Sequence, residues 1–176
     1  MFSDFLKTKV LQNCAKIITY NFGPCQGVVQ KYNIGVFTYV TWAIWAYNVG
    51  MDNKKLMTLI ERESVMIWDS LCEIYPALVC YDVPKVELNP YTWRTAGQCF
   101  QEENRVQLGY KFFKAKTEYF NYMIDVILPH ELIHQADFNL FGESEKICGH
   151  GEKWCEIMVN YGLPAEPYHS MEISRK

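Results

Sequence analysis

The sequence predicts an α+β protein built from one main domain, and three observations support this. The chain of 176 residues is long enough to bury a sizeable core. It is 49% hydrophobic and 15% aromatic, which is typical of a globular protein. Apolar residues recur at helical spacing on both sides of residues 83–110, whereas that segment holds short runs rich in β-branched and aromatic residues. We therefore expect a small antiparallel sheet packed on helices, plus an extra N-terminal helical segment.

The N-terminal half is predicted to be helical. Residues 2–20 have an amphipathic pattern, and residues 32–51 form an uncharged run that reads as a buried helix of the core. A membrane span is the alternative for this run, but its aromatic residues are spread throughout it instead of gathering at its two ends. The next helix is expected to begin after a cap at Asp52 and to end near Tyr75, before Pro76.

Three strands are predicted in the middle of the chain, at residues 83–88, 92–100 and 105–110. The second and third are separated by the polar sequence Gln-Glu-Glu-Asn at 101–104, which suits the turn of a hairpin. We expect all three to pair in an antiparallel sheet.

A helical pattern returns over residues 119–140, with Pro129 inside it. Proline is tolerated in the first turn of a helix and disrupts its interior, so this segment is either kinked or made of two helices. Gly142 is expected to close it. A last helix is predicted over residues 152–161, ending at Gly162.

Charge and cysteine content restrict the class of protein. A net charge of −3 excludes a polycation that coats nucleic acid by charge alone. Seven cysteines, an odd number with no C-x-x-C pair, argue against a disulfide framework and against a zinc ribbon of the usual spacing. We expect reduced thiols in an intracellular protein, cytoplasmic or, in a eukaryote, nuclear, with no membrane partner.

Residues 130–134 read His-Glu-Leu-Ile-His, an instance of H-E-x-x-H. Residues four apart lie on one face of a helix, so His130 and His134 can hold one metal ion. Zinc with three protein ligands keeps a position for water and lowers the pKa of that water. Glu131, adjacent to the ion, is then suited to act as the general base.

The third ligand is expected to be His150, which lies between two glycines after a loop. Flanking glycines let the backbone approach the preceding helix closely. Glu152 and Cys148 remain alternatives, and a thiolate would make the site structural. His169, near the C-terminus, is either a surface residue or, with Tyr168 as a substitute, a hydrogen-bond donor to the developing oxyanion.

Taken together, these motifs resemble the SprT-like metalloproteases, the family that includes the DNA-repair protease Spartan. The resemblance covers roughly residues 55–172 and rests on several sequences in order. These are Thr-Ala-Gly-Gln at 95–98, Arg-Val-Gln-Leu at 105–108, the H-E-x-x-H motif, His-Gly-Glu-Lys-Trp at 150–154, and Leu-Pro-Ala at 163–165 followed by His169.

The resemblance implies a zincin-like core over residues 55–176, Zn²⁺ on His130, His134 and His150, and catalysis by Glu131. It also implies cleavage of proteins trapped on DNA. Residues 1–54 match no part of the family pattern and are expected to form a helical extension packed on the core. Many family members carry a zinc ribbon after this core, and none is expected here.

A contact to single-stranded DNA is predicted at Lys111, Lys114 and Lys116, interleaved with Tyr110, Phe112 and Phe113. The alternative is a solvated loop whose aromatic side chains turn into the core.

Three functions follow from the sequence. The first is a zinc-dependent endopeptidase acting on a protein substrate or a DNA–protein complex. The second is a metal-bearing module that binds DNA or protein without cutting it. The third is a membrane-attached zinc protease.

Overall fold

The computed structural model describes residues 52–142 and 149–173. The expected helix at 2–20 and the uncharged run at 32–51 lie outside these residues, and so does nearly all of the predicted extension 1–54. Among the described helices, none is long and apolar enough to cross a membrane.

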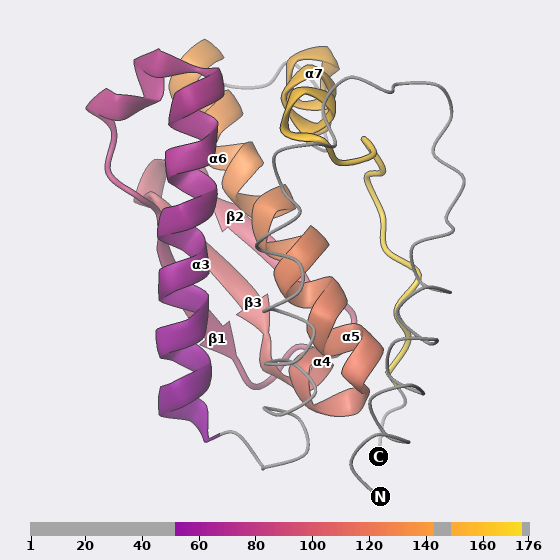
Figure 1. Ribbon diagram of the computed structural model, residues 1–176. Helices are drawn as coiled ribbons and strands as arrows, with labels where there is room; N and C mark the ends of the chain where they lie inside the picture. The colour runs from indigo at the N-terminus through magenta and orange to yellow at the C-terminus, as the bar shows by residue number, and fades with distance from the viewer. Residues whose placement is uncertain (1–51, 143–148, 174–176) are drawn as a thin grey trace, which may run out of the picture. The chain divides into compact units, whose positions relative to one another are not determined.

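The described chain begins with α3 (Asn53–Ile74), which runs the length of the domain (Figure 1). Its first turn is capped by Asp52, whose carboxylate accepts a hydrogen bond from the backbone N–H of Lys55 at 2.8 Å, as the sequence predicts. Pro76 opens a short 3₁₀ helix (Pro76–Cys80) directly after α3. The predicted helix is therefore confirmed at both ends.

The sheet has three strands, β1 (Lys85–Asn89), β2 (Gly97–Phe100) and β3 (Arg105–Gly109), in the order β1-β3-β2. The predicted hairpin is confirmed, because β2 pairs antiparallel with β3 across a 3₁₀ turn at Gln101–Glu103. The prediction of a wholly antiparallel sheet is wrong, since β1 pairs parallel with β3. The segment 90–96 reverses the chain, but β3 inserts between β1 and β2 and so has the same direction as β1.

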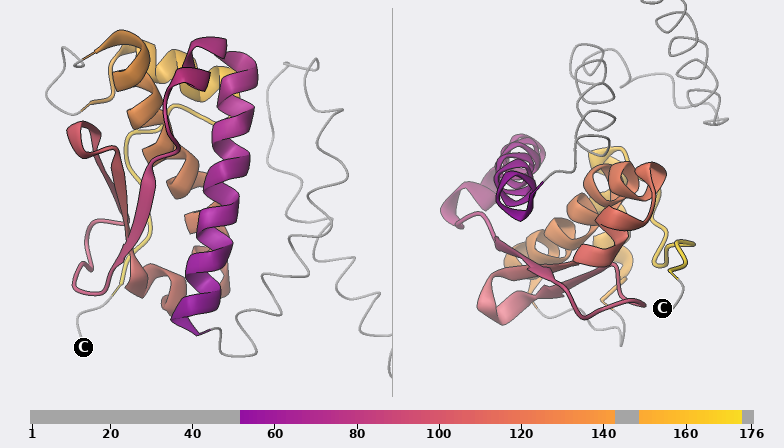
Figure 2. Two further views of the ribbon diagram at one scale, coloured as in Figure 1. Left: turned by 90° about the vertical axis from the view of Figure 1, so that its left-hand side faces the viewer. Right: turned by 90° about the horizontal axis from the view of Figure 1, so that it is seen from below.

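Helices α3 and α6 (Leu128–Phe141) cover one face of this sheet (Figures 1 and 2). The middle strand supplies Val106 and Leu108, both completely buried. Leu56, Ile60 and Leu71 from α3 and Leu132 and Ile133 from α6 are also buried in this core. The sheet and α6 are thereby held together by apolar burial, which fixes the position of the H-E-x-x-H helix.

The segment around Pro129 forms two α-helices joined by a π-helical turn. Helix α5 (Thr117–Tyr122) leads into the π turn (Met123–Ile127), and α6 follows directly. Pro129 lies in the first turn of α6, where its missing N–H is not needed. His130 is therefore at the start of the second helix, one of the two arrangements expected from the sequence.

Two further helices complete the described chain. Helix α4 (Tyr110–Ala115) was not predicted: it begins at Tyr110, which was expected to end the third strand, and it includes most of the segment for which a solvated loop was the alternative to a DNA contact. Gly142 ends α6 with a φ of 81°. Helix α7 (Glu152–Tyr161) has the predicted bounds, and Gly162 caps it in the left-handed region at φ 96°.

Candidate metal centre

Two histidines of the H-E-x-x-H motif project from the same face of α6. His130 and His134 are each 8% exposed, and their Nε2 atoms lie 3.2 Å apart. The helical spacing alone accounts for this approach, because residues i and i+4 are neighbours on a helix surface.

His150 completes a triangle with these two residues. It lies just before α7, and its Nε2 is 3.2 Å from the Nε2 of His130 and 3.2 Å from that of His134. Three ligand nitrogens on a tetrahedral zinc at 2.0–2.1 Å would be separated by about 3.3 Å. The triangle therefore fits a single ion of this size, and these three residues form a metal-binding group among the described residues.

Burial keeps the three imidazoles neutral. The pKa of His130 is lowered to about 4 and that of His134 to about 3. Burial is the larger cause in both cases, and the neighbouring histidines add to it. Burial also lowers the pKa of His150. Because a neutral imidazole is the form that binds metal, the site is prepared for a cation at neutral pH.

His134 is held by a hydrogen bond to the backbone of Gly149. Gly149 has a φ of 65°, and a Cβ added there would lie 3.4 Å from the His134 ring. A glycine beside His150 therefore brings the chain close to α6, which is the role that the sequence assigned to the flanking glycines.

Glu131 lies next to the ligands and is 6% exposed. Burial raises the pKa of its carboxyl to about 8, although a hydrogen bond from the backbone of Cys99 opposes the shift. A divalent cation held by the three histidines would lower this pKa, because positive charge favours the carboxylate. With such a cation bound, the Glu131 carboxylate could accept a proton at neutral pH.

Gly97 of β2 is what allows Glu131 to lie this close to the sheet. A Cβ at position 97 would lie 2.5 Å from Oε1, 2.6 Å from Cγ and 2.8 Å from Cδ of Glu131. The sequence alone indicates no function for Gly97 or for the Cys99 amide. Only the tertiary contact between β2 and α6 reveals both.

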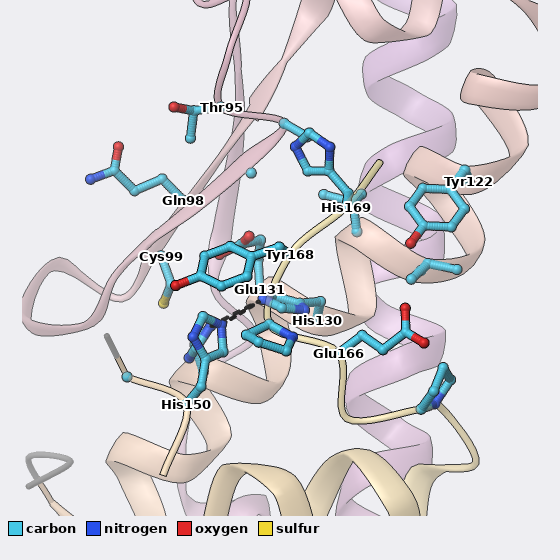
Figure 3. Close-up of a pocket in the computed structure, with 18 of the residues that line it drawn as sticks. Thr95, Gln98, Cys99, Tyr122, His130, Glu131, His150, Glu166, Tyr168 and His169 are labelled. Atoms are coloured by element: carbon cyan, nitrogen blue, oxygen red, sulfur yellow. Dashed lines mark hydrogen bonds between the residues drawn. The ribbon is translucent and has the colours of Figure 1, made fainter. Parts of the chain in front are cut away.

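The triangle lies in an open cleft of about 720 Å³. Residues 94–99, which include most of β2, line it, and so do Pro164 and residues 166–169; Figure 3 shows Gln98 and Cys99 on one side and Glu166 on the other. A metal ion in the triangle would therefore be open to a substrate lying along the cleft.

His169 and Tyr168 both line this cleft, as the second of the two interpretations for the tail requires. The Nδ1 atom of His169 accepts a hydrogen bond from the Met171 backbone N–H at 3.2 Å. A neutral imidazole with Nδ1 as acceptor carries its proton on Nε2, so His169 can donate a hydrogen bond. Tyr168 is 76% exposed, with its ring centroid 6.3 Å from that of His150.

Glu152, one of the two alternative ligands, is not part of the triangle. Glu152 is exposed and does not belong to the metal-binding group found among the described residues. Cys148 lies outside the residues that the structure describes.

The residues of the predicted DNA contact differ in their exposure. Lys111, Lys114 and Lys116 are all exposed, as the prediction requires. Phe112 and Phe113 are 0% and 1% exposed and belong to the core, so they cannot stack on bases. Phe112 instead contacts His169, with ring centroids 5.5 Å apart, and so supports the cleft wall from α4.

Comparison with known proteins agrees with this geometry. The model of the SprT-like family matches residues 82–173, which include the three strands, the H-E-x-x-H helix and α7. The chain belongs to the SprT-like family. The matched region is just over half of this SprT-like chain and contains every residue of the metal centre.

Among curated relatives, the SprT-like chain is similar to Protein SprT of Actinobacillus succinogenes, with 29% identity over 79 residues. That alignment covers 44% of this chain and 43% of the relative. Protein SprT of Vibrio atlanticus is 29% identical over 82 residues, covering 46% of each chain. The SprT-like chain thus spans less than half the length of either relative. No solved structure matches it.

Proposed function

We propose that this SprT-like chain is an intracellular zinc-dependent endopeptidase. The observation that carries the proposal is the triangle of three Nε2 atoms, 3.2 Å apart in an open cleft with Glu131 beside it. Family membership supports it, and so do the unpaired thiols of the four described cysteines, which are typical of a reducing compartment.

The donor set favours zinc. His130, His134 and His150 offer three neutral imidazole nitrogens, a set found in catalytic zinc sites with one further position for water. When bound, zinc would polarise the substrate carbonyl and lower the pKa of a water molecule in the cleft.

Glu131 is assigned the transfer of protons. Its carboxylate takes a proton from the attacking water and then delivers it to the leaving amine of the cleaved peptide bond. The Cys99 amide holds one end of this carboxylate, and burial keeps the pKa high enough for the proton to be accepted and then released. The same group thereby serves as base and acid.

The edge of β2 is assigned to the substrate backbone. The Gly109 N–H donates to the Ala96 carbonyl at 2.7 Å, so in this antiparallel pair the backbone groups of Gly97 and the Cys99 carbonyl point away from β3, whereas the Cys99 N–H is occupied by Glu131. An extended peptide can add to this edge by main-chain hydrogen bonds. Such a substrate would lie along the cleft and present a carbonyl to the metal centre.

His169 is assigned the stabilisation of the oxyanion. Its Nδ1 is occupied by the Met171 N–H, which leaves a proton on Nε2 for donation within the cleft. A hydrogen bond that strengthens as negative charge develops on the carbonyl oxygen lowers the barrier for attack. Tyr168 is the alternative donor on the same segment.

We further propose that DNA stimulates cleavage of DNA-bound proteins. The exposed lysines Lys111 and Lys114 lie on α4, which follows Gly109 directly. Gly109 is hydrogen-bonded to Ala96 in the cleft wall. Phosphates bound along α4 would therefore bring a DNA-bound protein near the metal centre.

The peptidase proposal is tested with the full chain and an unstructured protein substrate. Zinc-loaded protein is expected to produce fragments, and a chelator is expected to stop the reaction until zinc is restored. If fragments form equally well in the chelated sample, the activity does not come from a metal centre. If no protein substrate is cut with or without DNA, a non-cleaving binding module takes the place of the protease.

A further inference from the structure

A single tryptophan contacts all three histidines of the metal centre. Trp154 is completely buried, and its ring centroid lies 4.8 Å from that of His130, 5.2 Å from that of His134 and 4.5 Å from that of His150. The indole is stacked on His134, with 22° between the planes, and meets the other two rings edge to face.

The position of Trp154 joins two parts of the chain that supply ligands. It lies in the first turn of α7, four residues after His150, and α7 packs against α6, which carries His130 and His134. One side chain therefore fills the space behind ligands that are up to twenty residues apart in sequence.

The ring contacts matter because one of the three ligands lacks the usual supporting hydrogen bond. Ligand histidines are usually fixed by a hydrogen bond from the second ring nitrogen. Among the described residues, His134 has such a partner in the Gly149 backbone, whereas the buried Nδ1 of His150 has none. Edge-to-face packing against Trp154 therefore supports the imidazole of His150, which lacks this hydrogen bond.

The indole also favours the metal-loaded state electrostatically. An imidazole bound to a divalent ion acquires part of its positive charge, and the π face of tryptophan attracts cations better than that of tyrosine or phenylalanine. The stacked contact with His134 presents this face directly.

We propose that Trp154 is a positioning residue that holds the three imidazoles in metal-binding geometry. The proposal rests on the metal centre of the proposed function but not on the reaction that it performs. It predicts that loss of the indole weakens metal binding more strongly than it lowers the stability of the fold.

The test compares Trp154 with a matched tryptophan elsewhere in the core. Trp68 on α3 is 2% exposed, and its Nε1 donates to the Tyr81 carbonyl at 3.3 Å, but no ring contact joins it to the histidines. Zinc affinity is measured by competition with a chromophoric chelator, on variants shown by circular dichroism to be folded. We expect Trp154→Leu to weaken zinc binding by about 10- to 100-fold. The affinity of Trp154→Phe should lie between those of the parent and Trp154→Leu. Trp68→Leu should lower the melting temperature and leave the affinity within about twofold of the parent.

A second measurement uses intrinsic fluorescence and the milder substitutions. Zinc added to the metal-free parent should change tryptophan emission, because Trp154 touches every ligand. This change in emission should persist in Trp68→Phe and disappear in Trp154→Phe. The measurement on Trp68→Phe remains possible even if the Trp154 variants do not fold. The proposal would be overturned if Trp154→Leu bound zinc as tightly as Trp68→Leu does. It would also be overturned if zinc did not change the tryptophan emission of Trp68→Phe. A parent that binds zinc tightly but cuts no protein would contradict the peptidase function only.

Discussion

The contact between Gly97 and Glu131 gives a sharp prediction for Gly97→Ala. The added methyl would lie 2.5, 2.6 and 2.8 Å from Oε1, Cγ and Cδ of Glu131. Because carbon atoms normally pack at 3.5–4.0 Å, the Glu131 side chain must move by roughly 1 Å. Glu131 is 6% exposed, so there is little free space around it into which it can move.

Two effects of different size should follow. Overpacking of this kind lowers the free energy of unfolding by about 1–3 kcal/mol. A displacement of the base by 1 Å costs activity on the order of 100-fold. Zinc content should remain at one ion per chain, because the substitution does not touch the three histidines.

The assay is kcat/KM for cleavage of a protein substrate, measured with zinc content and thermal stability on the same samples. The Glu131→Gln background supplies the control, because Gly97→Ala should cause no further loss of activity once the base is absent. Parental activity in Gly97→Ala would refute the reasoning, since it would show that the position of Glu131 beside β2 has no catalytic importance.

Three further predictions concern the ligands, the buried carboxyl and the lysines. His150→Ala should weaken zinc binding by orders of magnitude, because three ligands become two; an unchanged affinity measured by chelator competition would show that another residue is the third ligand. In the metal-free protein, the pKa of about 8 for Glu131 lies above the unfolded value of 4.5, so its ionisation removes stability as pH rises from about 4.5 to 8. The metal-free Glu131→Gln variant should then have a free energy of unfolding up to about 5 kcal/mol higher than the parent at pH 8, since each pKa unit corresponds to about 1.4 kcal/mol. Equal denaturation midpoints of the two proteins at that pH would contradict the raised pKa of Glu131. Replacing Lys111, Lys114 and Lys116 with glutamate should abolish salt-sensitive binding to single-stranded DNA in an anisotropy titration, with zinc content unchanged; a triple variant that binds like the parent would place the contact elsewhere.

Local patterns were sufficient to predict the three longest helices among the described residues and the three clustered histidines. The helix at Asn53–Ile74 follows from one apolar face, a capping aspartate and a terminal proline. The residues of the H-E-x-x-H motif are four apart, so a single helical turn brings their side chains together before any tertiary contact is known. His150 could be added because the glycines beside it allow a close approach.

Features that depend on contacts distant in sequence could not be predicted in the same way. The parallel pairing of β1 with β3 is decided by where β3 inserts, and the alternation of residues within each strand carries no information on this. Lys111–Lys116 reads as a basic, aromatic-rich loop, but the burial of Phe112 and Phe113 depends on packing of α4 against the core. The functions of Gly97 and Trp154 are visible only where β2 and α7 meet α6.

The most direct test of the central claim is a comparison of zinc-loaded parent and Glu131→Gln on the same protein substrate. The amide has nearly the shape of the carboxylate, so the substitution removes the base and leaves the three ligands in place. We expect both proteins to hold one zinc per chain and only the parent to produce fragments. Equal cleavage by the two proteins would contradict the assignment of Glu131 and the mechanism built on it.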